Sequence, residues 1–356
     1  MSGVLDLGDF FSPFQRDLPQ SRMLEANLSD VCPLDNACEN SDSPIPSRRE
    51  PRSSMELFLQ QLLQGFKFGS IYALIALGYT MVYGVLRLIN FAHGDVFMLG
   101  AMLSIFFARW TGWGARPSWL ALAGILALAM AACALMGGLI ERLAYRPLRH
   151  ASRLSLLITA IGVSLFIENA GQLPIVFGAT PRAFPSLVET RPWITWGTLT
   201  VSNVEALVIG VALLLTGGLH VIVQRTRMGL AMRAVSFDFR TASLMGIPVD
   251  RVIGQTFMLG SALAGAAGVL YGLSYPAIDP LSGFMPGIKA FVAAVLGGIG
   301  SIPGALVGGI IIGEAETLTA GYLSSTYKDA IAFLILIAVL LFKPSGLLGR
   351  KVVEKV

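Results

Sequence analysis

Charged residues are scarce in this chain of 356 residues: 13% are Asp, Glu, Lys or Arg, whereas 54% are hydrophobic. An ordinary soluble domain is about one-quarter charged, so the composition excludes that class. Cysteine is scarce too, with three residues, which excludes a disulfide scaffold. A chain this apolar is neither a coiled coil nor a disordered binder, because both need a largely polar composition. Together with a mean hydropathy of +0.69, these absences indicate an integral membrane protein.

Metal-binding and nucleotide-binding motifs are also missing. The three histidines, His93, His150 and His220, belong to no HExxH motif and no Cys/His cluster, so we expect no metal site. No GxxxxGK[ST] occurs, and GGIGSIPG has Pro303 where a dinucleotide-binding loop needs its third glycine. We therefore expect that the chain is not an enzyme and that it binds neither ATP nor another cofactor itself.

Acidic and basic residues are unevenly distributed. Residues 1–54 carry nine Asp or Glu and five Arg, a net charge of −4, whereas residues 55–356 sum to +8. That basic surplus fits cytoplasmic loops better than nucleic-acid binding. Residues 1–54 are rich in Ser, Pro, Asp and Asn without any period, which predicts a disordered leader or, because Met55 resembles a start codon, a mis-set start. A soluble extension with its own role is the alternative.

Apolar runs fill the rest of the chain. They lie at about 65–86, 95–109, 119–141, 154–173, 204–223, 252–273, 287–300, 303–320 and 327–342. A straight transmembrane helix needs about 20 residues, so 95–109 and 287–300 predict tilted, broken or re-entrant helices. We expect an all-α polytopic membrane helical bundle of about eight spans, with nine or ten as alternatives, because an open sheet cannot satisfy its edges in lipid.

Basic clusters predict the orientation, because cytoplasmic loops are enriched in Lys and Arg. The clusters are Arg142, Arg146, Arg149 and Arg153; Arg225, Arg227, Arg233, Arg240 and Arg251; and Lys343, Arg350, Lys351 and Lys355. Two and four apolar runs separate them, and these even numbers return the chain to the same side. All five tryptophans fall in loops on the other side: Trp110, Trp113, Trp119, Trp193 and Trp196. The side of the N-terminus stays open, because 57–109 fits two or three crossings.

Small residues recur every four positions in two of the runs. They are Gly260, Ala264, Gly268 and Gly272 in one, and Gly300, Gly304 and Gly308 in the other. Small residues at this spacing let helix backbones approach closely in lipid. We therefore expect two ridges for helix packing.

A polar, basic segment, residues 225–251, separates two apolar runs. It also contains apolar residues, namely Leu230, Met232, Val235, Leu244 and Met245. Gly246 and Pro248 form a helix stop. The pattern predicts a short amphipathic helix at the membrane surface, which either lies on lipid or docks into a groove of a partner protein.

Several longer motifs carry a family resemblance. They are NFAHGD (90–95), ERLAYRPLR (141–149), LITAIGVSLFIEN (157–169), MRAVSFDFRTASLMGI (232–247), FMPGIKAFVAAVLGGIGSIPGALVGG (284–309), YLSSTYKD (322–329) and KPSGLLGRKVVEKV (343–356). These motifs resemble the permeases of branched-chain amino-acid ABC importers. NFAHGD and the closing VEKV resemble the H-type subunit of the two paralogous permeases. The resemblance runs from Met55 to Val356, and residues 1–54 have no counterpart.

The resemblance implies a permease of an ATP-driven importer for Leu, Ile or Val in the bacterial inner membrane. It implies as partners a paralogous M-type permease, two cytoplasmic ATP-binding subunits that use ATP and Mg, a periplasmic substrate-binding protein, and the lipid membrane, but no nucleic acid. The coupling segment of the family resembles 232–247, where Ala242-x-x-x-Gly246 keeps its spacing. The residues implied in coupling to the ATPase are Arg233, Asp238, Ala242, Leu244, Met245 and Gly246.

Charged and polar groups inside a bilayer are costly, which makes them candidates for function. The candidates for the translocation path are Asn90, His93, Asp95, Glu168, Asn169, Lys289 and Glu314. Such groups would make weak contacts with the ammonium and carboxylate of an amino acid. The alternative for each is helix capping or interhelical pairing, for example of Lys289 with Glu314.

Other functions stay open at this point. Permeases of urea, amide and aromatic-acid ABC importers are very similar, so the substrate is open within the family. A secondary transporter would need no ATPase and usually shows inverted repeats, of which we find no convincing example. A membrane scaffold would tolerate leucine at the polar positions of its spans.

Overall fold

The computed structural model describes residues 54–86, 88–115, 117–149, 151–196 and 199–349. The predicted leader, up to residue 53, lies outside the described residues. So do three members of the last basic cluster, Arg350, Lys351 and Lys355.

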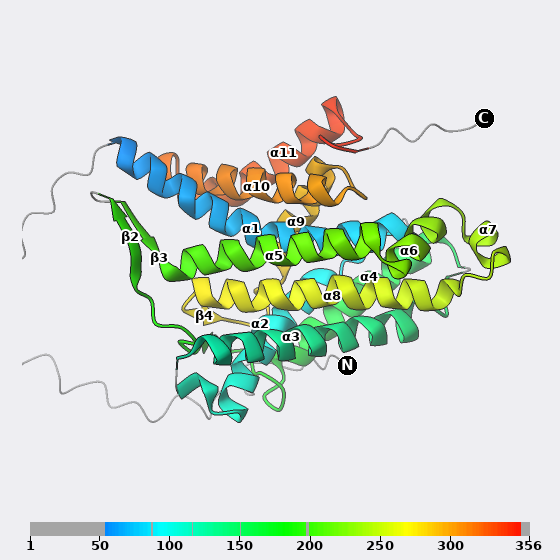
Figure 1. The fold of residues 1–356 in the computed structure, drawn as a ribbon, viewed down its shortest axis with the longest axis horizontal. Coiled ribbons are helices and arrows are strands. Elements are labelled where there is room, and N and C mark those ends of the chain that lie inside the picture. Colours follow the sequence, from blue (N-terminus) through cyan, green and yellow to red (C-terminus); the bar gives the residue numbers. More distant parts are fainter. Residues whose placement is uncertain (1–53, 87, 116, 150, 197–198, 350–356) are drawn as a thin grey trace, which may run out of the picture. The chain divides into compact units, whose positions relative to one another are not determined.

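Helices make up most of the described chain (Figure 1). The long ones are α1 (Ser54–Leu86), α2 (His93–Trp110), α3 (Trp119–Ile140), α4 (Arg153–Gln172), α5 (Asn203–Arg225), α8 (Val249–Ser274), α9 (Phe284–Gly297), α10 (Ile302–Tyr322) and α11 (Lys328–Phe342). Two shorter helices, α6 (Arg227–Phe237) and α7 (Phe239–Leu244), join α5 to α8. A π-helical turn, η3 (Glu141–Tyr145), prolongs α3. Single 3-10 turns are η2 (Trp113–Ala115) and η4 (Ser325–Tyr327).

Seven of the described helices are long and apolar enough to cross a membrane. Besides the short helices α6 and α7, the two that are not are α2 and α9, which correspond to the short apolar runs 95–109 and 287–300. When α2 and α9 are included, each predicted apolar run corresponds to a helix. The predicted fold class, an all-α polytopic membrane bundle with broken helices, is therefore confirmed.

The bundle has two chemically different ends, which lie at opposite sides of Figure 1. At one end α3 and α5 finish, α6 and α7 lie, and α8 begins; Arg146 pairs with Asp250 there at 2.7 Å. We call it the basic end. At the other, α2 finishes at Trp110 and α3 begins at Trp119, and we call it the tryptophan end. Since α1 begins at the tryptophan end, where Gln64 donates to Glu205 at the start of α5, residues 57–109 contain one pass by α1 and one by α2.

Four short strands, which the sequence did not predict, lie at the tryptophan end. Strands β2 (Pro192–Trp196) and β3 (Leu199–Ser202) form an antiparallel pair, and β1 (Arg182–Ala183) pairs with β4 (Ala277–Ile278). The hairpin leads directly into α5, whose start carries a capping box: the Ser202 hydroxyl accepts from the Glu205 amide, and the Glu205 carboxylate accepts from the Ser202 amide. Such a cap satisfies two helix-end amides.

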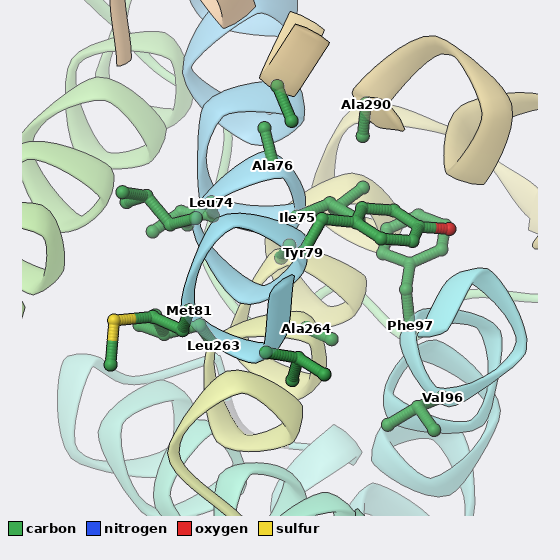
Figure 2. Close-up of a cluster of buried hydrophobic side chains, with 14 of the residues drawn as sticks. Leu74, Ile75, Ala76, Tyr79, Met81, Val96, Phe97, Leu263, Ala264 and Ala290 are labelled. Atoms are coloured by element: carbon green, nitrogen blue, oxygen red, sulfur yellow. The ribbon is translucent and has the colours of Figure 1, made fainter. Parts of the chain in front are cut away.

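Helix α1 forms the centre of the bundle. In its most apolar window 83% of the residues are buried, against 72% for α8, 22% for α4 and 6% for α11. Figure 2 shows Ile75 and Tyr79 of α1 beside Phe97 of α2 and Ala290 of α9. Because α4 and α11 expose large apolar side chains in a chain that spans the membrane, they provide much of its outer surface.

Candidate functional site

Helices α2 and α9 both begin inside the bundle rather than at its ends. The ring of His93, the first residue of α2, lies against Gly78 of α1, eight residues before α1 ends. At 1.5 Å per residue this places the start of α2 about 12 Å inward from the end of α1. A Cβ on Gly283, just before α9, would lie 2.6 Å from the carbonyl oxygen of Gly94. The two helices thus meet at their N-termini, inside the bundle.

Three of the predicted path residues lie at this break, and all three are buried. Asn90 accepts a hydrogen bond from the Tyr145 hydroxyl at 2.9 Å, and Asp95 accepts one from the Ser164 hydroxyl at 2.5 Å. The His93 ring packs edge-on against Tyr79 with centroids 4.8 Å apart. Its Nε2 has no hydrogen-bond partner among the described residues. Asn90 and Asp95 therefore link separate segments of the bundle, which supports interhelical pairing as their role.

Glu168 and Asn169 lie near the end of α4. Asn169 is exposed and donates to the carbonyl oxygen of Leu165 in its own helix at 2.7 Å. Glu168 is half-buried and close enough to Asp95 for the two carboxyl groups to interact. Ser164, Glu168 and Gln172 follow one another at intervals of four residues, so they share the face of α4 that looks toward α2.

Lys289 of α9 is paired, but not with Glu314 as the sequence analysis suggested. Its ammonium lies 2.7 Å from Glu316 Oε1 and 2.6 Å from Asp329 Oδ1, and the Tyr72 hydroxyl donates to Glu316 at 2.7 Å. Positions 314 and 316 differ by about 200° around a helix, so their side chains face different neighbours. Glu314 instead lies beside Gly65 of α1, with a buried Oε2 that has no partner among the described residues.

The small residues of α8 lie at helix crossings. A Cβ on Gly260 would lie 3.3 Å from the Gly78 carbonyl oxygen, and Gly268 packs on the backbone of α2. Ala264 is fully buried, whereas Gly272 faces the ring of Phe184. On α10, Gly304 and Gly308 pack against the backbone of α9.

Gly300 does not belong to this ridge, which corrects the prediction. It lies in the turn before α10, which begins at Ile302, and no atom lies within 4 Å of the position of its missing Cβ. Its φ of 94° explains the glycine, because L side chains rarely adopt that conformation.

The predicted coupling segment consists of two helices rather than one. Thr226 caps α6 and Asp238 caps α7, where its carboxylate accepts from the Arg240 amide at 2.8 Å and from the Thr241 hydroxyl at 2.8 Å. Hydrogen bonds hold the pKa of Asp238 below its usual range; the largest effect comes from the Thr241 hydroxyl, and the amides of Arg240 and Thr241 add to it. The Asp238 carboxylate therefore stays ionised at neutral pH. Arg233 is also engaged within the chain, since it donates to the Val223 carbonyl oxygen at the end of α5.

The two small residues of the predicted coupling segment, Ala242 and Gly246, are not exposed side chains on its surface. Ala242 is 4% exposed and faces its own chain. Gly246 lies in open space with a φ of 78°, so it ends α7 in the left-handed conformation. The exposed side chains of this segment include large apolar ones: Phe237, Leu244 and Met245 are 86%, 87% and 77% exposed. Phe237 was not among the predicted residues, although its position at the end of the apolar face of α6 is the signal that indicates it.

Each predicted site residue now has a place. Of the path candidates, Asn90, His93 and Asp95 lie at the start of α2, and Glu168 and Asn169 lie near the end of α4. Lys289 lies in α9, and Glu314 lies on α10 beside α1. The coupling candidates lie at the basic end, on helices that extend beyond the bundle (Figure 1). The arrangement defines a multi-pass membrane protein with broken helices and an exposed apolar surface at one end.

Comparison with known proteins gives the family. Residues 61–340 match the family described as branched-chain amino acid transport system / permease component. The chain is 47% identical over 304 residues to the high-affinity branched-chain amino acid transport system permease protein LivH of Salmonella typhimurium (strain LT2), and 46% identical over 304 residues to LivH of Escherichia coli (strain K12). It is 44% identical over 307 residues to the corresponding protein BraD of Pseudomonas aeruginosa (strain PAO1). Each comparison covers 84% of this chain and 98% of the relative. The chain therefore belongs to this permease family, and the family predicted from its motifs is confirmed.

Proposed function

We propose that this chain is the H-type permease subunit of an ATP-driven importer of Leu, Ile and Val in the bacterial inner membrane. The match to the permease family over residues 61–340 carries this proposal. Near-complete coverage of relatives named for branched-chain amino acid transport supports the choice of substrate over urea, amides and aromatic acids.

The translocation path forms between this chain and a paralogous M-type permease. In support, α4 exposes much of its surface while carrying Glu168 within an apolar helix. Placing a carboxyl group in contact with lipid costs free energy. We therefore infer that a protein partner or water covers this edge of α4.

Two cytoplasmic ATP-binding subunits hydrolyse ATP with Mg, and this chain binds no cofactor itself. They dock at the basic end, on the side chains of Phe237, Leu244 and Met245. Exposed apolar side chains of this size suit a groove in a partner protein. The basic residues around them, such as Arg227 and Arg240, agree with a cytoplasmic location. A periplasmic binding protein delivers the substrate to the tryptophan end.

The test is uptake of labelled leucine by proteoliposomes that contain the complete complex, the binding protein outside and ATP inside. We expect uptake that requires internal ATP and the binding protein and that persists when an ionophore removes ion gradients. Uptake that persists without the ATP-binding subunits but stops with the ionophore would instead identify a secondary transporter. Uptake of urea or an amide but not of leucine would contradict the proposed substrate.

A further inference from the structure

A cavity of about 430 Å³ opens at the tryptophan end, between the segment that follows α4 and the segment that joins β4 to α9. Its wall is mainly apolar, with Pro181, Leu281 and Met285 among the lining residues, and its polar lining includes Gln172, Tyr271 and Asp279. Small-molecule sites have this character: a concave, mostly apolar surface with a few placed polar groups. The volume is sufficient for a single amino acid.

Asp279 is the acidic group of the cavity, and a turn holds it in place. Its Oδ1 accepts a hydrogen bond from the Leu281 amide at 2.8 Å, and its own amide donates to the Ser282 hydroxyl at 3.1 Å. No donor from the described part of the chain contacts its Oδ2, and no described cation pairs with it. One carboxylate oxygen is thus fixed while the other is available to a ligand.

A cation, Arg182, lies close to the cavity in the fold but is not one of its lining residues. It neighbours the lining residue Pro181, and in the β1–β4 pair it lies opposite Ile278, which precedes Asp279. Its Nε donates to the Phe177 carbonyl oxygen at 2.6 Å, which fixes the guanidinium, and no carboxylate of the described residues forms an ion pair with it. The carboxylate of Asp279 is therefore the charged group among the lining residues, and no described ion pair engages it.

We propose that this cavity is an outward-facing site for a free α-amino acid with a branched apolar side chain. The ammonium binds Asp279, and the side chain packs against Pro181, Leu281 and Met285. This assignment rests on the proposed function, since it takes the tryptophan end to be the outer side.

Gln172 is the first of a row of polar residues on α4 that extends from the cavity toward the middle of the bundle. Gln172 lines the cavity, and Glu168 and Ser164 follow it inward along the same face of α4. Ser164 donates to Asp95 at the start of the broken helix α2. A polar edge therefore connects the cavity to the middle of the bundle, along the same α4 surface that we assign to the second permease.

The site can be tested by saturation-transfer NMR on the purified complex without the binding protein. The probes are leucine and 4-methylpentanoate, which lacks the ammonium. Asp279→Asn keeps the turn but removes the charge, Ala179→Trp fills the cavity, and Glu189→Gln removes an exposed carboxylate at the same end as the matched control. Leucine uptake by the same preparations with the binding protein reports on the proposed function separately.

We expect wild-type complex to bind leucine at least tenfold more tightly than 4-methylpentanoate, because a charge-assisted hydrogen bond contributes about tenfold or more in affinity. Asp279→Asn should remove this preference, Ala179→Trp should abolish both signals, and Glu189→Gln should change neither. A complex that imports leucine but shows no signal, or the same preference in Asp279→Asn, would overturn the site and leave the proposed function intact. A wild-type complex that neither binds nor imports leucine would overturn both.

Discussion

In the bundle around α1, glycines lie where two backbones meet, whereas Gly246, just after α7, lies in open space. A Cβ on Gly100 would lie 2.6 Å from the Cα of Gly265, but nothing lies within 4 Å of the position of a Cβ on Gly246. Large side chains show the opposite distribution: Phe97 and Phe257 are buried in the bundle, whereas Phe237 and Leu244, in α6 and α7, are exposed. Small residues thus make close contacts within the bundle, whereas large apolar residues form much of the exposed surface of α6 and α7, so the residue type alone does not show whether a position is buried.

Loss of the charge on Lys289 should have the largest effect on the bundle. Lys289→Met would leave Glu316 buried without its cation, and breaking a buried ion pair typically costs about 3–5 kcal/mol. We expect little folded protein in detergent extracts by fluorescence-detected size exclusion. Lys289→Met with Glu316→Gln should recover much of the yield. Wild-type yield in the single variant would show that the network contributes little.

A large residue at a helix crossing comes next. Gly100→Leu places its side chain against the backbone of α8, and overpacking of this kind costs about 1–3 kcal/mol or more. We expect a clearly lower melting temperature in detergent. The matched control is Gly210→Leu on α5, where no atom lies within 4 Å and the residue is exposed, so its melting temperature should stay near that of the wild type. Equal effects of both substitutions would remove the distinction between the two surfaces.

Substitution of Gly246 should have a smaller effect on stability, and for a different reason. Gly246→Ala meets no neighbour but forces a Cβ into the left-handed conformation, which costs roughly 1–2 kcal/mol. Gly246→Asn should cost less, because asparagine tolerates this conformation. Hydrogen exchange of α7 amides in the complete complex measures the difference. Equal exchange in both variants would indicate that steric contact, not backbone conformation, selects glycine here.

Much of the fold could be predicted because apolar runs and turn signals are local. The runs located the helices, and the polar residues at 90–95 located the start of a broken helix. The partner of Lys289 could not be predicted, because Glu314 and Glu316 are two residues apart and only packing decides which one faces α9. Nor could the burial of Ala242, since the orientation of the short helix α7 depends on contacts with its neighbours. The strands at the tryptophan end depend on pairing between distant segments, such as 182–183 with 277–278.

The most direct measurement of the central claim is co-purification of the ATP-binding subunits with Leu244→Ser/Met245→Ser, together with leucine uptake. Removing two exposed apolar anchors should weaken docking about 30-fold or more without affecting the bundle, since neither side chain is buried. Ile194→Ser, an exposed apolar residue at the tryptophan end, is the control. We expect loss of the ATP-binding subunits and of uptake in the double variant, with both retained in the control. Wild-type association and uptake in the double variant would contradict it.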